Sequence, residues 1–289
     1  MDFYADYVRV TIGWPCPICG KPDWCAVARD GKTALCPRVV SETDLGEKGY
    51  LHLLEGTEVP PAQTPPPRLS PIALQKKVDG WKRRADHEDK LFEIAMILGV
   101  DAADLADMGV GWTGDSWSFP MKDAFGNTIG IRLRYPNGKK GAVRGSRQGV
   151  FYPYRKFLST DTMWFPEGPS DTAALLGIGL FAVGRPNNLA GNNILLQMMN
   201  RYNQRRAVVV ADNDPAGMRG ALKLARLLQE NNYPVFIIKP RACKDARECT
   251  RHGADRQDIM DIFNPQPNSV FWETIPCPSP SLLKPLQPS

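Results

Sequence analysis

The second half of the chain alternates short apolar runs with amphipathic stretches. Strand-like runs at 162–166, 180–183, 206–211 and 234–239 are separated by helix-like stretches at 170–176, 192–202 and 215–230. Strands that alternate with helices are typical of a parallel sheet covered by helices on its faces. We therefore predict an α/β domain over residues 161–275.

Acidic residues follow two of these predicted strands. Glu167 comes after the first, and Asp212 and Asp214 come after the third. The carboxyl ends of parallel strands share one crevice, and acids crowded there need a cation such as Mg²⁺, which prefers oxygen ligands and leaves positions open for phosphate. The alternative is structural, because an Asp at a helix N-cap followed by Pro215 is also common. A cap explains one Asp and leaves its neighbour, the Glu167-Gly168 turn and a further acid, Asp245, unexplained.

Four cysteines near the amino terminus have the spacing of a metal site. Cys16 and Cys19 form a Cys-x-x-Cys turn, followed by Cys25 and Cys36. Four thiolates satisfy tetrahedral Zn²⁺ and can fold a segment that is too small to have its own core. The second pair is irregularly spaced, so His52 is an alternative to Cys25 as the fourth ligand. We predict a zinc-ribbon β module over residues 1–56.

Proline-rich segments separate the remaining parts. Residues 57–71 hold six prolines in fifteen positions and predict an extended linker, and residues 276–289 hold five and predict a tail. Between them, residues 81–108 show helical spacing, and residues 116–154 contain strand-like runs joined by turns. We predict a mixed α+β subdomain over residues 72–160, with antiparallel strands.

This subdomain is strongly basic. From Lys122 to Phe157 there are nine Lys or Arg residues and one acid, Asp123, whereas the whole chain carries a net charge of +5. Such a segment is a candidate face for a polyanion, and the alternative is a solvated basic surface. No long apolar run and no leader-like amino terminus occur, so we expect a cytoplasmic protein that does not contact membranes.

Three acidic motifs together resemble the toprim domain of DnaG-type primases, topoisomerases and some nucleases. They are Glu167-Gly168-x-x-Asp171, Asp212-x-Asp214-x-Ala216-Gly217 and Lys244-Asp245. The preceding segment, Phe119-Pro120-Met121-x-Asp123 through Arg134, is similar to the basic subdomain that accompanies toprim in primases. With the cysteine module, the resemblance covers about residues 10–55 and 90–250 and points to primases of phages and mobile elements.

The resemblance implies roles for particular residues. Catalytic acids would be Glu167, Asp212 and Asp214, which would hold Mg²⁺ or Mn²⁺, with Asp171 and Asp245 assisting. Nucleotide and template would be bound by Arg132, Arg134, Lys139, Lys140, Arg144 and Lys244. Two cations in such a site would activate a 3′-hydroxyl and stabilise the leaving triphosphate.

The function that we expect from the sequence is synthesis of short RNA primers on single-stranded DNA from ribonucleoside triphosphates. No Walker-type phosphate loop is present, so a replicative helicase would be a separate protein. One alternative is a toprim nuclease or topoisomerase-like cleavage enzyme, which uses the same acids. The other is a non-catalytic nucleic-acid-binding adaptor.

Overall fold

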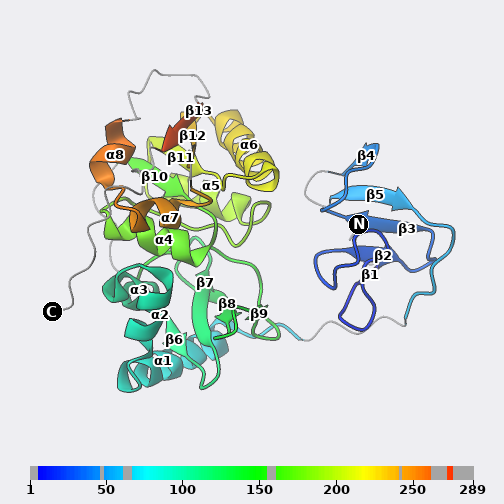
Figure 1. Ribbon diagram of the computed structural model, residues 1–289, viewed down its shortest axis with the longest axis horizontal. Helices are drawn as coiled ribbons and strands as arrows, with labels where there is room; N and C mark the ends of the chain where they lie inside the picture. Colours follow the sequence, from blue (N-terminus) through cyan, green and yellow to red (C-terminus); the bar gives the residue numbers. More distant parts are fainter. Residues whose placement is uncertain are drawn as a thin grey trace. The chain divides into compact units, whose positions relative to one another are not determined.

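The computed structural model describes residues 6–45, 49–60, 67–154, 161–240, 243–261 and 272–275. Its contacts divide the chain into two compact units, residues 1–66 and 67–289 (Figure 1). The predicted tail and the end of the basic segment, residues 155–157, lie outside the described residues. Within the described residues, no helix is both long and apolar enough to span a bilayer.

The first unit is an antiparallel sheet built from five short strands in the order β1-β2-β3-β5-β4. The strands are β1 (Tyr7–Arg9), β2 (Ala26–Ala28), β3 (Thr33–Cys36), β4 (Thr43–Asp44) and β5 (Tyr50–Leu53). Its small core combines Val10, Val27 and Ala34 with three buried cysteines. Apolar burial this limited rarely stabilises a domain of this size without a metal or disulfides.

Three helices open the second unit: α1 (Pro71–His87), α2 (Lys90–Leu98) and α3 (Ala102–Met108). Helix α1 begins earlier than the periodicity of residues 81–108 indicates. The side chain of Ser70 accepts a hydrogen bond from the backbone N–H of Ala73 at 3.2 Å, and Pro71 occupies the first turn, where its missing N–H costs nothing.

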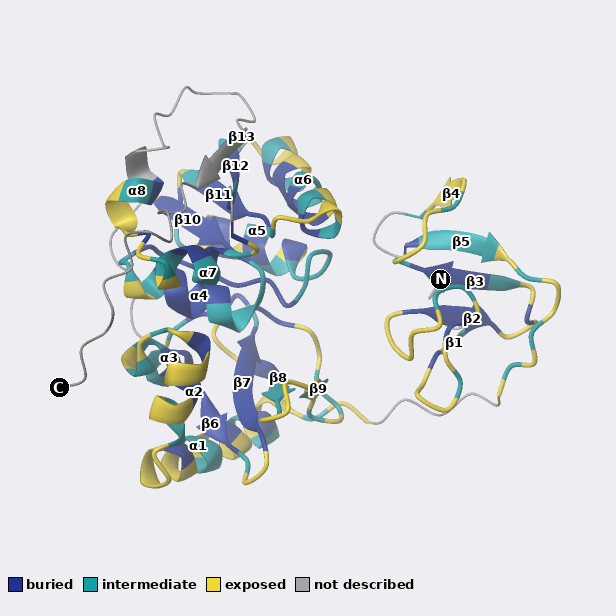
Figure 2. Cartoon of the chain, in the orientation of Figure 1, coloured by how far each residue is buried: buried dark blue, intermediate teal, exposed yellow. Residues whose placement is uncertain are grey.

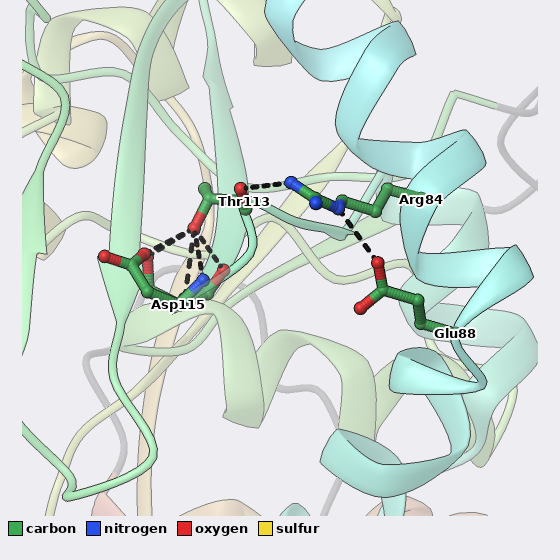
Figure 3. Close-up of polar contacts among 5 residues, drawn as sticks. Arg84, Glu88, Thr113 and Asp115 are labelled. Atoms are coloured by element: carbon green, nitrogen blue, oxygen red, sulfur yellow. Dashed lines mark hydrogen bonds and ion pairs between the residues drawn. The ribbon is translucent and has the colours of Figure 1, made fainter.

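A polar cluster connects α1 to the turn between β6 (Gly111–Trp112) and β7 (Trp117–Lys122) (Figure 3). Arg84 donates through Nε to Glu88 at 2.9 Å and through Nη1 to the carbonyl of Thr113 at 2.9 Å. The hydroxyl of Thr113 donates to Asp115 at 2.7 Å. The exposed Arg84–Glu88 ion pair by itself contributes little. The bond to the Thr113 carbonyl adds to the apolar contact that Leu74 and Val78 of α1 make with Ile131.

The strands β6 (Gly111–Trp112), β7 (Trp117–Lys122), β8 (Thr128–Arg134) and β9 (Lys140–Ala142) form an antiparallel meander in sequence order. Alternate residues of β7, namely Trp117, Phe119 and Met121, pack against the helices through Ile94 and Leu98. The antiparallel arrangement that the sequence predicted for this region is confirmed.

The strands β10 (Thr162–Phe165), β11 (Arg206–Val210), β12 (Val235–Pro240) and β13 (Trp272–Ile275) form a parallel sheet in that order. The predicted run at 180–183 lies beside β10 but makes only an isolated bridge, Ala182 to Trp164. The sequence did not predict β13, which pairs with β12.

Helices cover both faces of this sheet. On one face, α5 (Asn192–Arg201) and α6 (Pro215–Glu230) pack on Phe165, Val209 and Ile237. On the other, α4 (Gly168–Gly177), α7 (Ala246–Arg251) and α8 (Arg256–Asp261) contribute to a second core with Trp164 and Val208. Figure 2 shows the resulting buried strands between partly exposed helices. The predicted α/β class is confirmed.

Candidate metal centres and catalytic site

The four amino-terminal cysteines converge in the first unit. The Sγ atoms of Cys16, Cys19, Cys25 and Cys36 all lie within 4.8 Å of one another, and Cys19 and Cys25 are 3.6 Å apart. Ligand sulfurs at about 2.3 Å from a tetrahedral Zn²⁺ are separated by about 3.8 Å, so the cluster fits the ion. His52 lies on β5 with Nε2 3.1 Å from the carbonyl oxygen of Val39, and Cys25 is the fourth member of the cluster.

The protonation of the cysteines also reflects crowding. Burial raises the pKa of Cys25 and of Cys36. Burial acts to raise the pKa of Cys19 too, but hydrogen bonds from the Lys21 backbone and the neighbouring thiols lower it to about 7. Arg38 adds a positive charge, with Nη1 3.8 Å from the Cys25 sulfur and Nη2 2.7 Å from Asp23. The cluster can bind zinc as thiolates held by a neighbouring cation.

The carboxylate site begins at the end of β10. Glu167 is the N-cap residue of α4, but its side chain makes no capping hydrogen bond. The next residue, Gly168, turns the chain with φ +80°, a conformation that L side chains rarely adopt. Glu167 therefore occupies the cap position of α4, but its carboxylate does not act as the cap.

Asp212 lies two residues beyond β11, the strand next to β10. Helix α6 approaches it closely: a Cβ atom on Gly217 would lie 2.8 Å from the Asp212 carbonyl oxygen. None of the described residues donates a hydrogen bond to the carboxylate of Asp212 or to that of Glu167. Half-buried carboxylates that lack donors are unfavourable as anions and are suited to a cation.

The other three acids are engaged in the fold. Asp214 caps α6 by accepting from the Gly217 N–H at 2.7 Å, and Asp245 caps α7 by accepting from the Glu248 N–H at 2.8 Å. Asp171 is buried in the first turn of α4 and accepts from the backbone N–H of Arg247 at 2.9 Å. The structural alternative thus holds for one oxygen each of Asp214 and Asp245 and leaves Glu167 and Asp212 without such a role.

The acids are close enough to affect one another. Burial and the charges of Glu167 and Asp171 raise the pKa of Asp212 to about 8. Burial and Asp245 raise the pKa of Asp171 to about 7. Burial also raises the pKa of Glu167, although nearby Arg185 acts in the opposite direction. A divalent cation bound between these carboxylates would relieve this repulsion.

In the described part of the chain, the cysteines are the only Cys, His, Asp or Glu group of three or more with ligand atoms within such close range. The carboxylates are arranged more openly. Mg²⁺ is commonly held by one or two carboxylates, waters and substrate phosphates, so Glu167 and Asp212 with the second oxygen of Asp214 fit that mode of binding.

Basic side chains of β8 and β9 approach the acids. Loss of hydration lowers the pKa of Arg132, whereas the negative charge of Glu167 acts to raise it. Partial desolvation and the cations Arg134, Arg132 and Lys244 lower the pKa of Lys140, and Glu167 again acts to raise it. Three of the six predicted nucleotide- or template-binding residues are thus within electrostatic range of a fourth, Lys140, and both Lys140 and Arg132 are within range of Glu167.

The two remaining residues of that set are both exposed: Lys139 lies in the turn between β8 and β9, and Arg144 follows β9.

The position of Lys122 differs from what the charge pattern of the sequence indicates. It is 1% exposed and donates to the Tyr152 carbonyl at 2.7 Å, and burial together with the charge of Lys82 lowers its pKa to about 7. Assigning Lys122 to the basic face is wrong, because its ammonium lies inside the subdomain.

The sequence analysis did not predict one residue of the site, Arg185. Arg185 is fully buried and is close enough to Glu167 and Asp212 to affect the pKa of both. In the sequence, Arg185 stands two residues after the strand-like run at 180–183, and this position alone does not distinguish a buried arginine from an exposed one.

Comparisons with known proteins identify part of this architecture. Residues 167–250 match the family model described as Toprim-like. This segment is similar to Toprim-like domains. The match includes Glu167, Asp171, Asp212, Asp214 and Asp245 within its bounds. A search of curated protein sequences found no match.

Solved structures extend the likeness beyond residues 167–250. A DNA primase domain from Pseudomonas aeruginosa matches with TM-score 0.53 at 16% identity, covering 67% of this chain and 78% of that one. The Aquifex aeolicus primase, with its zinc-binding and RNA polymerase domains, matches with TM-score 0.53 at 16% identity over 63% of this chain and 57% of that one. The E. coli primase catalytic core matches with TM-score 0.50 at 13% identity, covering 64% and 77%. At such identities these likenesses establish the fold.

Proposed function

We propose that this chain is a DNA primase that makes short RNA primers on single-stranded DNA by metal-dependent nucleotidyl transfer. The observation that carries the proposal is the pair Glu167 and Asp212. These carboxylates follow neighbouring parallel strands, receive no hydrogen bond from the described residues, and lie in a basic environment. Such a pair suits a cation that in turn binds a triphosphate.

In this proposal Glu167, Asp212 and the second oxygen of Asp214 hold Mg²⁺ or Mn²⁺. The cation would supply charge stabilisation to the transferring phosphate and favour ionisation of the attacking hydroxyl. Asp171 assists indirectly, because its bond to the Arg247 backbone positions α7 beside the site. Asp245 assists by capping that helix.

The basic residues are assigned to the anionic substrates. Arg132, Arg134, Lys140 and Lys244 would bind the phosphates of the incoming ribonucleotide, since Arg132 and Lys140 act on the same Glu167 carboxylate. The exposed Lys139 and Arg144 would follow the template backbone. The cysteine unit, loaded with zinc, would contribute to template binding, and a helicase would be a separate partner.

The test is synthesis of labelled RNA on single-stranded DNA templates of varied sequence with ribonucleotides and Mg²⁺. Short products should form with the unsubstituted protein and disappear with Glu167→Gln or Asp212→Asn. Lys76→Ala, a change on α1 outside the proposed site, is the matched control and should retain synthesis. Absence of products on every template, with cleavage of plasmid DNA that does not require nucleotides, would replace the proposal by the toprim nuclease alternative. DNA binding that is independent of Mg²⁺ and of both acids would replace it by an adaptor.

A further inference from the structure

Arg185 connects to the site first through its backbone. Its N–H donates to the Pro166 carbonyl at 2.9 Å, and its carbonyl accepts from the Gly168 N–H at 2.8 Å. These two bonds flank Glu167 on either side. The position of the Glu167 turn is therefore set by the segment that carries Arg185.

The side chain of Arg185 reaches the neighbouring strand. Nη2 donates to the Val210 carbonyl at 3.2 Å, two residues before Asp212, and Nη1 lies 3.4 Å from the Asn188 carbonyl. Asn188 in turn donates through Nδ2 to the Ala216 carbonyl at 3.0 Å, at the start of α6. One residue thus holds the Glu167 turn with its backbone and the Asp212 turn with its guanidinium.

The environment of Arg185 is unusual for an arginine. The residue is 0% exposed, and Nε has no hydrogen-bond partner among the described residues. Its guanidinium makes no ion pair within 4.0 Å in the described part of the chain, although Glu167 and Asp212 are in electrostatic range. A buried cation bonded mainly to carbonyls costs stability, and an apolar side chain would serve packing better.

We propose that Arg185 is a positioning residue that fixes the separation of Glu167 and Asp212 and so preorganises the pair for a divalent cation. The planar guanidinium can bond two carbonyls at once in a fixed geometry, which a lysine ammonium on a flexible stem does not reproduce. The inference rests on the proposed metal site, and it assigns the geometry of that site to a residue that binds neither metal nor substrate.

The experiment is Mn²⁺ binding to the zinc-loaded full chain, followed by the electron paramagnetic resonance signal of free Mn²⁺. Specific Mn²⁺ binding is defined as the binding that is lost in Asp212→Asn. Arg185→Lys keeps the charge but loses the paired carbonyl contacts, and Arg185→Met loses both. We expect each to weaken specific Mn²⁺ binding by about 10- to 100-fold, the range for outer-shell partners of metal ligands.

Lys122→Met is the matched control, because it also replaces a fully buried cation that donates to a carbonyl. It should leave Mn²⁺ affinity unchanged even where it alters stability. If the Arg185 variants do not fold, Asn188→Ala cuts the same connection at Ala216 and should weaken binding in the same direction.

Three results would overturn this role. Unchanged affinity in folded Arg185 variants means that the residue serves only the fold. Tighter binding by Arg185→Met means that its charge opposes the cation and that its contacts do not preorganise the pair. Failure of the unsubstituted protein to bind Mn²⁺ at all removes the proposed metal site as well, which separates that failure from the other two.

Discussion

Replacing Asp212 with asparagine should change how the stability of the magnesium-free protein depends on pH. Burial and the nearby charge of Glu167 raise the pKa of Asp212 from 3.8 to about 8. Between these values the native protein retains a proton that the unfolded chain has released, so stability falls as the pH rises from about 4 to about 8. Asparagine cannot ionise, and the variant should lack this loss.

The size of the effect follows from that interval. At about 1.36 kcal/mol for each pH unit, an interval of about four units corresponds to at most about 6 kcal/mol. Asp212 is partly exposed and shares the repulsion with Glu167, so we expect about a third of that, about 2 kcal/mol. For a unit of this size, about 2 kcal/mol corresponds to about 4 to 8 °C in Tm.

The assay is thermal unfolding of both proteins at pH 5 and pH 8 in magnesium-free buffer without chelator, so that zinc stays bound. Because pH 5 to pH 8 spans about three of the four units, the Tm of Asp212→Asn minus that of the unsubstituted protein should increase by about 3 to 6 °C between the two pH values. Added Mg²⁺ at pH 8 should then raise the Tm of the unsubstituted protein only. Parallel pH dependence of the two proteins would refute the reasoning that Asp212 is held at an electrostatic cost.

Three further predictions concern other parts of the molecule. Removing zinc by chelation, or substituting Cys16→Ser, should unfold residues 1–66 and leave the parallel sheet intact, as measured by limited proteolysis with zinc content of the chain as the control. Gly217→Ala should lower the free energy of unfolding of the second unit by about 1 to 3 kcal/mol in urea, because the added Cβ meets the Asp212 backbone. The control is Gly80→Ala on helix α1, where the added Cβ lies in open space, and it should raise that free energy by about 0.5 to 1 kcal/mol. Equal effects of the two substitutions would contradict the close approach of Gly217 to Asp212. Lys139→Ala and Arg144→Ala should each reduce the slope of log affinity for single-stranded DNA against log salt by about 0.7, and an unchanged slope in fluorescence anisotropy titrations would remove these two exposed residues from the template-binding face.

Local patterns predicted much of the fold. Asp214-Pro215 marks the start of α6 because a cap and a first-turn proline act within a few residues, and the apolar run before Asp212 marks β11. Strand β13 was not predicted because its pairing with β12 depends on a partner that is distant in the sequence. The run at 180–183 is apolar like a strand, but only Ala182 pairs, in a single bridge to Trp164.

The sequence predicted the charged residues that follow a strand and did not predict the charged residues that are buried. Glu167 and Asp212 follow apolar runs, so their placement follows from topology alone. Arg185 and Lys122 carry no local signal that distinguishes a buried cation from a surface one, because their burial depends on carbonyls from other segments, Val210 and Tyr152. Choosing Cys25 over His52 likewise required the three-dimensional convergence of sulfurs.

The most direct test of the metal site is anomalous scattering from crystals of the full chain grown with zinc and soaked in Mn²⁺. The account predicts a manganese peak bound by carboxylate oxygens of Glu167 and Asp212 at about 2.2 Å, and loss of that peak in Asp212→Asn. A saturating soak without density between these carboxylates, or a peak at other acids that persists in the variant, would contradict it.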